Sequence, residues 1–96
     1  ETVAVRVGGS GGGNLGDFKA IVEIGAAINK NGTLSIDKTR TVIANVGTTS
    51  GWISDIGVSA LTGPYLLQQV KGANNRDIMW ATTIRMTQIK TGVVLT

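Results

Sequence analysis

The first candidate for chemistry is a glycine-rich stretch near the start of the chain, Val7–Asp17, in which six of the eleven residues are glycine. Gly11, Gly13 and Gly16 have the G-x-G-x-x-G spacing that allows backbone amides to bind a dinucleotide pyrophosphate. That function also needs a helix directly after the loop, because the helix N-terminus stabilises the phosphate charge. The residues that follow, Phe18–Ile24, alternate as a strand does, so we predict a flexible hairpin connection instead of a nucleotide site.

Catalytic residues of the usual kinds are missing from this sequence. It contains no histidine and no cysteine, the residues most often used as general bases and nucleophiles. The six carboxylates are dispersed and mostly lie beside turn residues, where aspartate commonly accepts hydrogen bonds from nearby backbone. They are Glu1, Asp17, Glu23, Asp37, Asp55 and Asp77. We therefore expect no enzymatic activity, no cofactor and no metal site.

Basic and hydroxyl side chains form a second candidate site, for nucleic acid. Thr83, Arg85 and Thr87 alternate on one face of the last predicted strand, and Lys38 or Arg40 from a neighbouring strand would extend that face. Such a face could contact RNA phosphates and base edges. The net charge is only +3 and no aromatic residue is interleaved on the face, so an ordinary solvated surface is the alternative.

Gly51, Trp52 and Asp55 form a third candidate site, for a sugar. An indole stacks on the apolar face of a sugar ring, while a carboxylate and glycine amides bind its hydroxyl groups. The alternative is structural, because a lone tryptophan beside a turn is commonly part of the core and a nearby aspartate caps the turn.

The elements that must position these residues follow a period of two. Strands are predicted over residues 2–7, 17–25, 40–46, 52–61 and, as the longest, 76–90, with a further short edge strand over 91–96. Asn31-Gly32 predicts a hairpin turn between apolar stretches. Residues 64–72 fit either a helix of two turns beginning at Pro64 or another strand.

The first strand shows the alternation most clearly. Its valines, Val3, Val5 and Val7, share one face, and the other face carries Thr2, Ala4 and Arg6. This pattern is typical of a half-buried strand.

The predicted fold class is all-β. Residues 1–96 form a single domain, an antiparallel sheet, sandwich or small barrel of six to seven strands with at most one short helix. The sequence has no run of eighteen apolar residues, so no transmembrane helix is expected.

Assembly is the function that composition favours. A chain of 96 residues without cysteine supports only a modest core, and the charged fraction of 16% is low against roughly a quarter in typical domains. Exposed sheet edges also pair readily with other copies. We predict a non-enzymatic, self-assembling structural subunit of a virion coat, a decoration layer or a surface filament, located in a virion or on an extracellular surface.

Two pairs of segments resemble known families. "TVAVRVGGSGG" and "RDIMWATTIRMTQIKT" are similar to the first hairpin and the final strand of coat proteins from single-stranded RNA bacteriophages. That resemblance implies a β-sheet dimer whose dimers tile a shell and whose RNA-facing sheet includes Thr83, Arg85 and Thr87. "GGSGGG" and "SGWISDIGV" are similar to the sugar-binding loops of jacalin-like lectins, which implies the alternative function of a carbohydrate-binding lectin or adhesin module.

Overall fold

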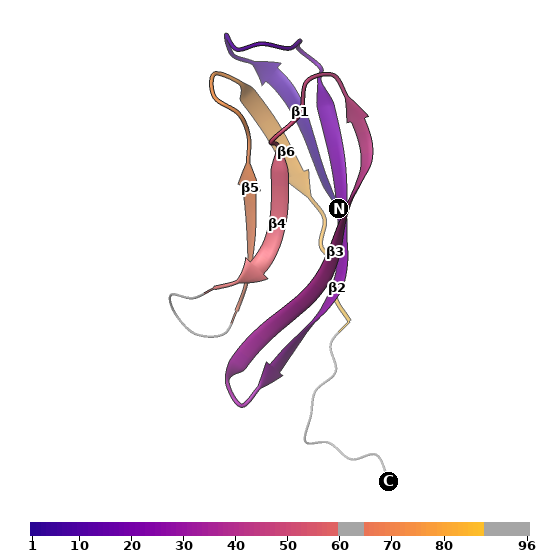
Figure 1. The fold of residues 1–96 in the computed structure, drawn as a ribbon, viewed down its shortest axis with the longest axis vertical. Helices are drawn as coiled ribbons and strands as arrows, with labels where there is room; N and C mark the ends of the chain where they lie inside the picture. The colour runs from indigo at the N-terminus through magenta and orange to yellow at the C-terminus, as the bar shows by residue number, and fades with distance from the viewer. Residues whose placement is uncertain (60–64, 88–96) are drawn as a thin grey trace.

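The computed structural model describes residues 1–59 and 65–87, and these form six strands and no helix (Figure 1). The strands are β1 (Thr2–Gly8), β2 (Phe18–Lys30), β3 (Thr33–Val46), β4 (Ile53–Val58), β5 (Leu66–Lys71) and β6 (Asp77–Thr82). The predicted all-β class is confirmed. The segment that fitted either a helix or a strand is strand β5 where it is described, and the edge strand expected over 91–96 lies outside the described residues.

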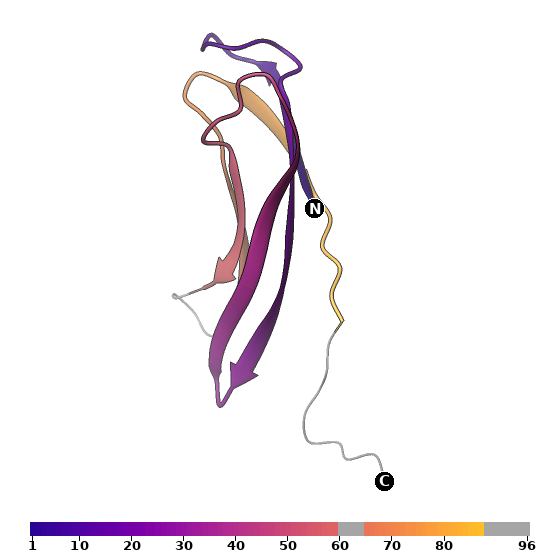
Figure 2. The ribbon, with the colours of Figure 1, turned by 45° about the vertical axis from the view of Figure 1, so that its right-hand side comes forward.

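The strands form two antiparallel sheets. The larger has the order β3-β2-β1-β6, and the smaller consists of β4 and β5. In Figure 2 the smaller sheet lies to the left of the larger sheet and faces one side of it, which we call the inner face. No strand or helix of the described residues covers the opposite, outer face, and the arrangement is an open sandwich with no closed barrel.

The β2–β3 hairpin is the longest feature of the molecule. Its turn is the predicted Asn31-Gly32, where both residues have positive φ (54° and 83°), as a two-residue hairpin turn requires. The register pairs Lys30 with Thr33 and runs back to Phe18 opposite Val46. A bulge after Ala20 shifts the register by one residue of β3. Residues 22–41 extend beyond the end of β1, and we call this part the arm (Figure 1).

Strand β1 alternates as predicted, but its apolar face is the exposed one. Thr2, Ala4 and Arg6 are buried on the inner face, with at most 4% of their surface exposed. Val3 and Val7, on the outer face, are 40% and 53% exposed. A half-buried strand normally turns its apolar side to the core, so this inversion requires an explanation.

The prediction of one long last strand over 76–90 is wrong. Strand β6 ends at Thr82, and the backbones of Thr83 and Glu1 exchange two hydrogen bonds of 2.8 Å just beyond it. The ladder with β1 ends where Thr82 lies opposite Thr2, and no strand of the described residues pairs with residues 84–87. Residues 88–90 lie outside the part of the chain that the structure describes.

The space between the sheets is small and unusually polar. Among the described residues, the buried hydrophobic side chains on the inner side are Ala4, Ile21 and Trp52, and Ala20 is buried on the outer side, opposite Val3. A hydroxyl pair bridges the layers, with Thr2 Oγ1 2.8 Å from Ser54 Oγ, and within its own sheet Thr2 Oγ1 lies 3.0 Å from Thr82 Oγ1. Hydrogen bonds therefore supply much of the contact between the two sheets.

Candidate functional site

The backbone carbonyl oxygens of the glycine-rich loop between β1 and β2 bind the side chain of Arg6. The guanidinium group of Arg6 donates hydrogen bonds to the carbonyl oxygens of Gly8 (2.9 Å), Gly9 (2.9 Å), Gly11 (3.0 Å) and Gly12. A phosphate loop has the reverse arrangement, with backbone N–H groups converging on an anion. The predicted hairpin connection is confirmed, and the loop's carbonyl oxygens are used to hold an arginine.

Asp17 fixes the other end of this loop. Its carboxylate is buried and accepts hydrogen bonds from the backbone of Asn14 (2.9 Å) and Thr48 (3.2 Å). Gly47 is needed beside it, because its φ is +84° and a side chain there would collide with the carboxylate. The Asn14 bond, the Thr48 bond and the positive charge of Arg6 lower the pKa of Asp17 below its usual value, against the opposing effect of burial.

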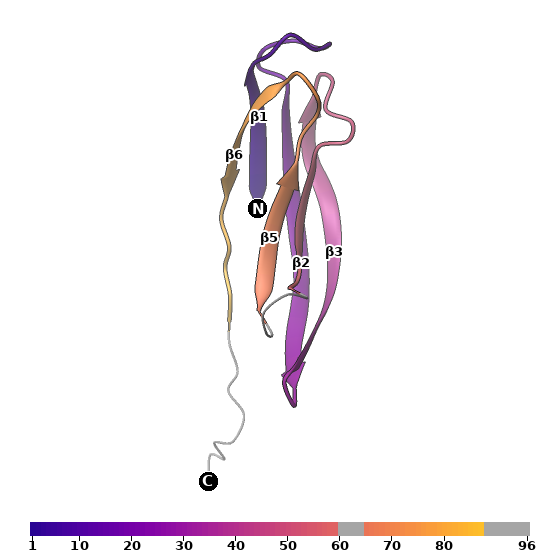
Figure 3. The ribbon, with the colours of Figure 1, turned by 90° about the vertical axis from the view of Figure 1, so that its left-hand side faces the viewer.

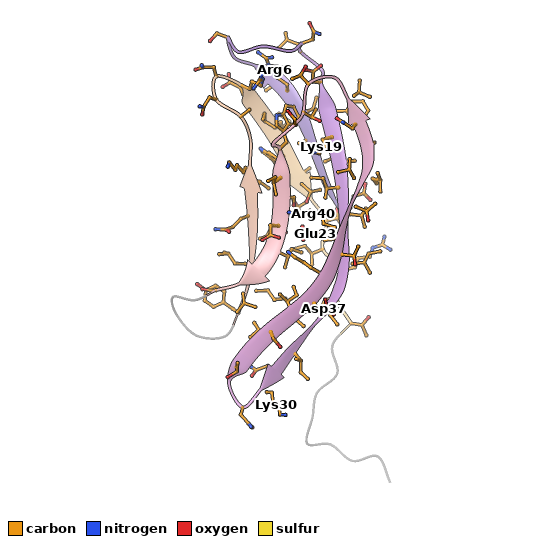
Figure 4. The ribbon with its side chains drawn as sticks, viewed as in Figure 1. Arg6, Lys19, Glu23, Lys30, Asp37 and Arg40 are labelled. Carbon is orange, nitrogen blue, oxygen red and sulfur yellow. The ribbon has the colours of Figure 1, made fainter. Side chains whose placement is uncertain are left out.

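Lys38 and Arg40, two residues of the predicted RNA face, are used to attach the arm to β4. Lys38 Nζ lies 2.9 Å from Glu23 Oε2 and also contacts the Asp55 carboxylate, while Arg40 Nη1 lies 3.7 Å from Asp55 Oδ1. Burial by itself would lower the pKa of Lys38, but its hydrogen bonds to Asp55 and Glu23 outweigh burial and raise that pKa above its usual value. Figure 4 shows Arg40 and Glu23 beside each other where the arm passes β4.

The same side chains satisfy the open backbone edge of β4. Arg40 Nη1 donates to the carbonyl of Ser54 (3.2 Å), Lys38 Nζ donates to the carbonyl of Ile56, and Glu23 accepts from the Ile56 amide (3.2 Å). These are the groups that an adjacent strand would otherwise bind. The carboxylates Glu23 and Asp55, predicted to be dispersed, thus belong to one docking cluster.

The residues of the predicted RNA face do not share a surface. Lys38 and Arg40 come from β3, which is one edge of the four-stranded sheet, whereas β6 is the opposite edge. Thr83, Arg85 and Thr87 follow β6 in extended chain and are exposed. The prediction that Lys38 or Arg40 lies beside them is wrong, because β2 and β1 separate the two edges; RNA contact through Arg85 stays a prediction.

The predicted sugar site is not open at the surface, because its tryptophan is buried. Trp52 is only 1% exposed, so its ring faces are not open to a sugar, and the alternative prediction of a core tryptophan is confirmed. Its indole N–H is buried without a hydrogen-bond partner among the described residues. Gly51 lies in the turn before β4 with φ of +84°, and Asp55 pairs with Lys38 instead of capping that turn.

Six of the sixteen exposed large hydrophobic side chains of the described residues lie on the outer face of the four-stranded sheet. The strand registers place Val5, Met79 and Phe18 side by side, with Val46 next to Phe18. We call the following six the outer apolar face, and each is between 40% and 73% exposed: Val3, Val7, Ile24, Ile28, Val46 and Met79. Figure 3 shows β6, β1, β2 and β3 following one another across this sheet.

Sequence patterns did not identify this surface. Ile24 and Ile28 lie two and six residues beyond Val22 on the same side of β2, so an alternating apolar series continues past the end of β1. This continuation is the one signal that could have indicated an uncovered apolar surface.

The comparisons leave the chain without a family assignment. No family model matches it, and neither a curated protein nor a solved structure is significantly similar to it. The resemblances to RNA bacteriophage coat proteins and to jacalin-like lectins therefore stay predictions. Within residues 1–59 and 65–87, no group of three or more potential metal-binding side chains occurs, and no helix there is long and apolar enough to cross a membrane.

Proposed function

We propose that the protein is a non-enzymatic structural subunit that assembles with copies of itself, as the subunits of virion coats, decoration layers and surface filaments do. The observation that carries the proposal is the inverted burial of β1. This strand buries Thr2 and Arg6 and leaves Val3 and Val7 at the surface. Because water disfavours exposed apolar area, such a strand is better accommodated when a further layer covers its outer side.

The balance between buried and exposed hydrophobic residues supports the same proposal. Four hydrophobic residues are buried in the described chain, whereas sixteen large ones are at least 37% exposed. The molecule is a slab with principal extents of 59 × 28 × 16 Å, which leaves little interior. Scattered hydrophobic residues are normal on a protein surface, but contiguous apolar patches of this kind mark interfaces.

A virion or an extracellular surface is the location that fits this proposal. Of the two ligands predicted from the sequence, RNA retains Arg85 as its exposed basic residue, and Lys38 and Arg40 are already paired with carboxylates. The alternative function of a lectin or adhesin loses its stacking residue, because Trp52 is buried.

Light scattering during size-exclusion chromatography, together with negative-stain electron microscopy, tests the proposal. We expect oligomers or larger particles whose abundance rises with protein concentration. A monomer at every concentration, with no particles or filaments, would contradict it.

A further inference from the structure

This inference rests on the proposed function and specifies its surface and partner. We propose that the outer apolar face is the assembly interface, and that its occupant is the same face of a second copy of this chain, related by a two-fold axis. A surface that binds its own copy must be complementary to itself.

The chemistry of the face meets this condition. Where all four strands pair, the cross-strand neighbours on the outer side are apolar, as with Val3 opposite Ala20 and Ala81. Two like charges brought together would oppose a two-fold contact, and no charged residue interrupts this four-stranded part of the face. Polar residues border it instead, since Thr39 and Thr41 are opposite Ile24 and Val22 in the arm. In the arm, the outer side carries one exposed acidic residue, Asp37, opposite Ala26. An apolar centre with a polar rim is the usual anatomy of an interface.

The size of the face matches a stable dimer. Outside the arm, β1 and β6 contribute seven and six residues, β2 residues 18–21 and β3 residues 42–46; at about 3.3 Å per residue and about 4.8 Å between strands they give a flat area of roughly 350 Å². The outer side of the arm, two strands roughly 30 Å long, adds about 300 Å² by the same dimensions. Standard interfaces bury about 600–1,000 Å² on each partner, so one copy of this chain can supply a face at the lower end of the required size.

Edge-to-edge pairing of two copies would leave the outer apolar face exposed to water. The open edge of β4 already has its backbone groups satisfied by Lys38, Arg40 and Glu23. Pairing through the edges β3 or β6 would add backbone hydrogen bonds but would not cover Ile24 or Met79, which are 73% and 61% exposed. Face-to-face packing removes those side chains from water.

Lysine substitutions test the assignment of the face. Ile24→Lys and Met79→Lys place a charge on it from two different strands, and because both sites are exposed in the single chain, neither should prevent folding. Leu67→Lys is the matched control, since Leu67 is an exposed aliphatic residue on the smaller sheet. Analytical ultracentrifugation should show the dimer dissociation constant raised at least about 100-fold in both face variants, because an unpaired charge would be buried, and changed by less than about 3-fold in the control.

The outcomes separate this inference from the proposed function. If the wild-type chain assembles and the face variants assemble equally well, the assignment of the interface to the outer apolar face is wrong, while the proposed function stands. If the control dissociates as readily as the face variants, the assignment to the outer face is also wrong. If the wild-type chain is a monomer, both proposals fail.

Methionine oxidation gives a second measurement that does not require a variant. The chain has two methionines, Met79 on the outer apolar face and Met86 in the exposed segment after β6, with 61% and 68% of their surfaces exposed in the single chain. At protein concentrations at which the chain assembles, we expect hydrogen peroxide to oxidise Met86 at least about 10-fold faster than Met79. Dilution, or the Ile24→Lys substitution, should make the two oxidation rates equal. Equal rates in the assembled protein would contradict the face-to-face arrangement, as would protection of Met79 in a species shown to be monomeric.

Discussion

Replacing Arg6 tests how the glycine-rich loop is held. Arg6 is 4% exposed and donates four hydrogen bonds to loop carbonyl oxygens, so its guanidinium group serves as the interior support of an otherwise flexible segment. Arg6→Met keeps much of the aliphatic volume and removes all four donors. It also removes a positive charge that acts on the buried carboxylate of Asp17.

The expected loss is large for so small a domain. A hydrogen bond from a charged donor contributes about 1.5–3 kcal/mol net, and four of them set an upper limit of roughly 6–12 kcal/mol. Most of the glycine residues concerned are exposed or half-buried, so water can replace Arg6 at their carbonyl oxygens. We therefore expect a loss of about 3–4 kcal/mol, which is a substantial part of the roughly 5–15 kcal/mol that stabilises typical domains.

Urea unfolding followed by tryptophan fluorescence measures this loss, at one fixed protein concentration because assembly adds to apparent stability. Arg6→Lys is the control: it keeps the charge, but a single ammonium cannot span four carbonyl oxygens, so we expect an intermediate loss of about 2 kcal/mol. Amide exchange over residues 8–14 should accelerate in both variants. A loss below about 1 kcal/mol for Arg6→Met, or unchanged exchange in the loop, would refute the assigned role.

Three further predictions concern the groups around the loop and the arm. Because the pKa of Asp17 is lowered in the folded state, its ionised carboxylate stabilises the fold above the ordinary aspartate pKa, and this stabilisation is lost as the pH falls below that value. Asp17→Asn should therefore make the free energy of unfolding depend less on pH below about pH 4. An unchanged dependence on pH in this acid range would count against the prediction. The raised pKa of Lys38 stabilises the fold below pH 10.5 and ceases to do so as pH rises further. Lys38→Met should therefore remove the loss of stability at alkaline pH, and at neutral pH it should cost about 2 kcal/mol by leaving Glu23 unpaired. Urea unfolding should show part of that stability recovered in the double variant that also carries Glu23→Gln. Trp52→Phe should cost about 1–2 kcal/mol through a cavity in the core, and circular dichroism melting that shows no change would contradict the burial of this ring.

Local patterns predicted the strands well because their causes are local. The Asn31-Gly32 turn needs two residues with positive φ, and these residue types adopt that conformation at little cost. The alternation in residues 2–7 likewise predicted correctly which side chains of β1 share a face. What alternation cannot provide is which face another layer covers, since that depends on the path of β4 and β5.

The candidate sites were harder to predict for a related reason. Lys38, Asp55 and Glu23 are separated by tens of residues at most, but only the crossing of the arm over β4 brings them together. The prediction of a long last strand was wrong because alternation does not show where strand pairing stops, and β6 pairs with β1 only as far as Thr82 opposite Thr2. Sequence reasoning therefore recovered the elements and missed the sites that depend on how distant elements pack.

The distribution of polarity across the sheet links folding to assembly. On the inner face, the contact between the two sheets depends on one buried tryptophan together with hydroxyl groups and ion pairs, and these polar contacts contribute modestly once water is displaced from them. On the outer face, side chains such as Ile24 and Met79 each hold apolar area that contributes only when it is covered. In the proposed assembly, the hydrophobic stabilisation available to this chain is divided between two events, closure of the sandwich and contact with a second copy. A subunit built in this way folds with a small margin alone and becomes markedly more stable in the assembly, which favours a shell or filament that holds its subunits over a pool of free monomers.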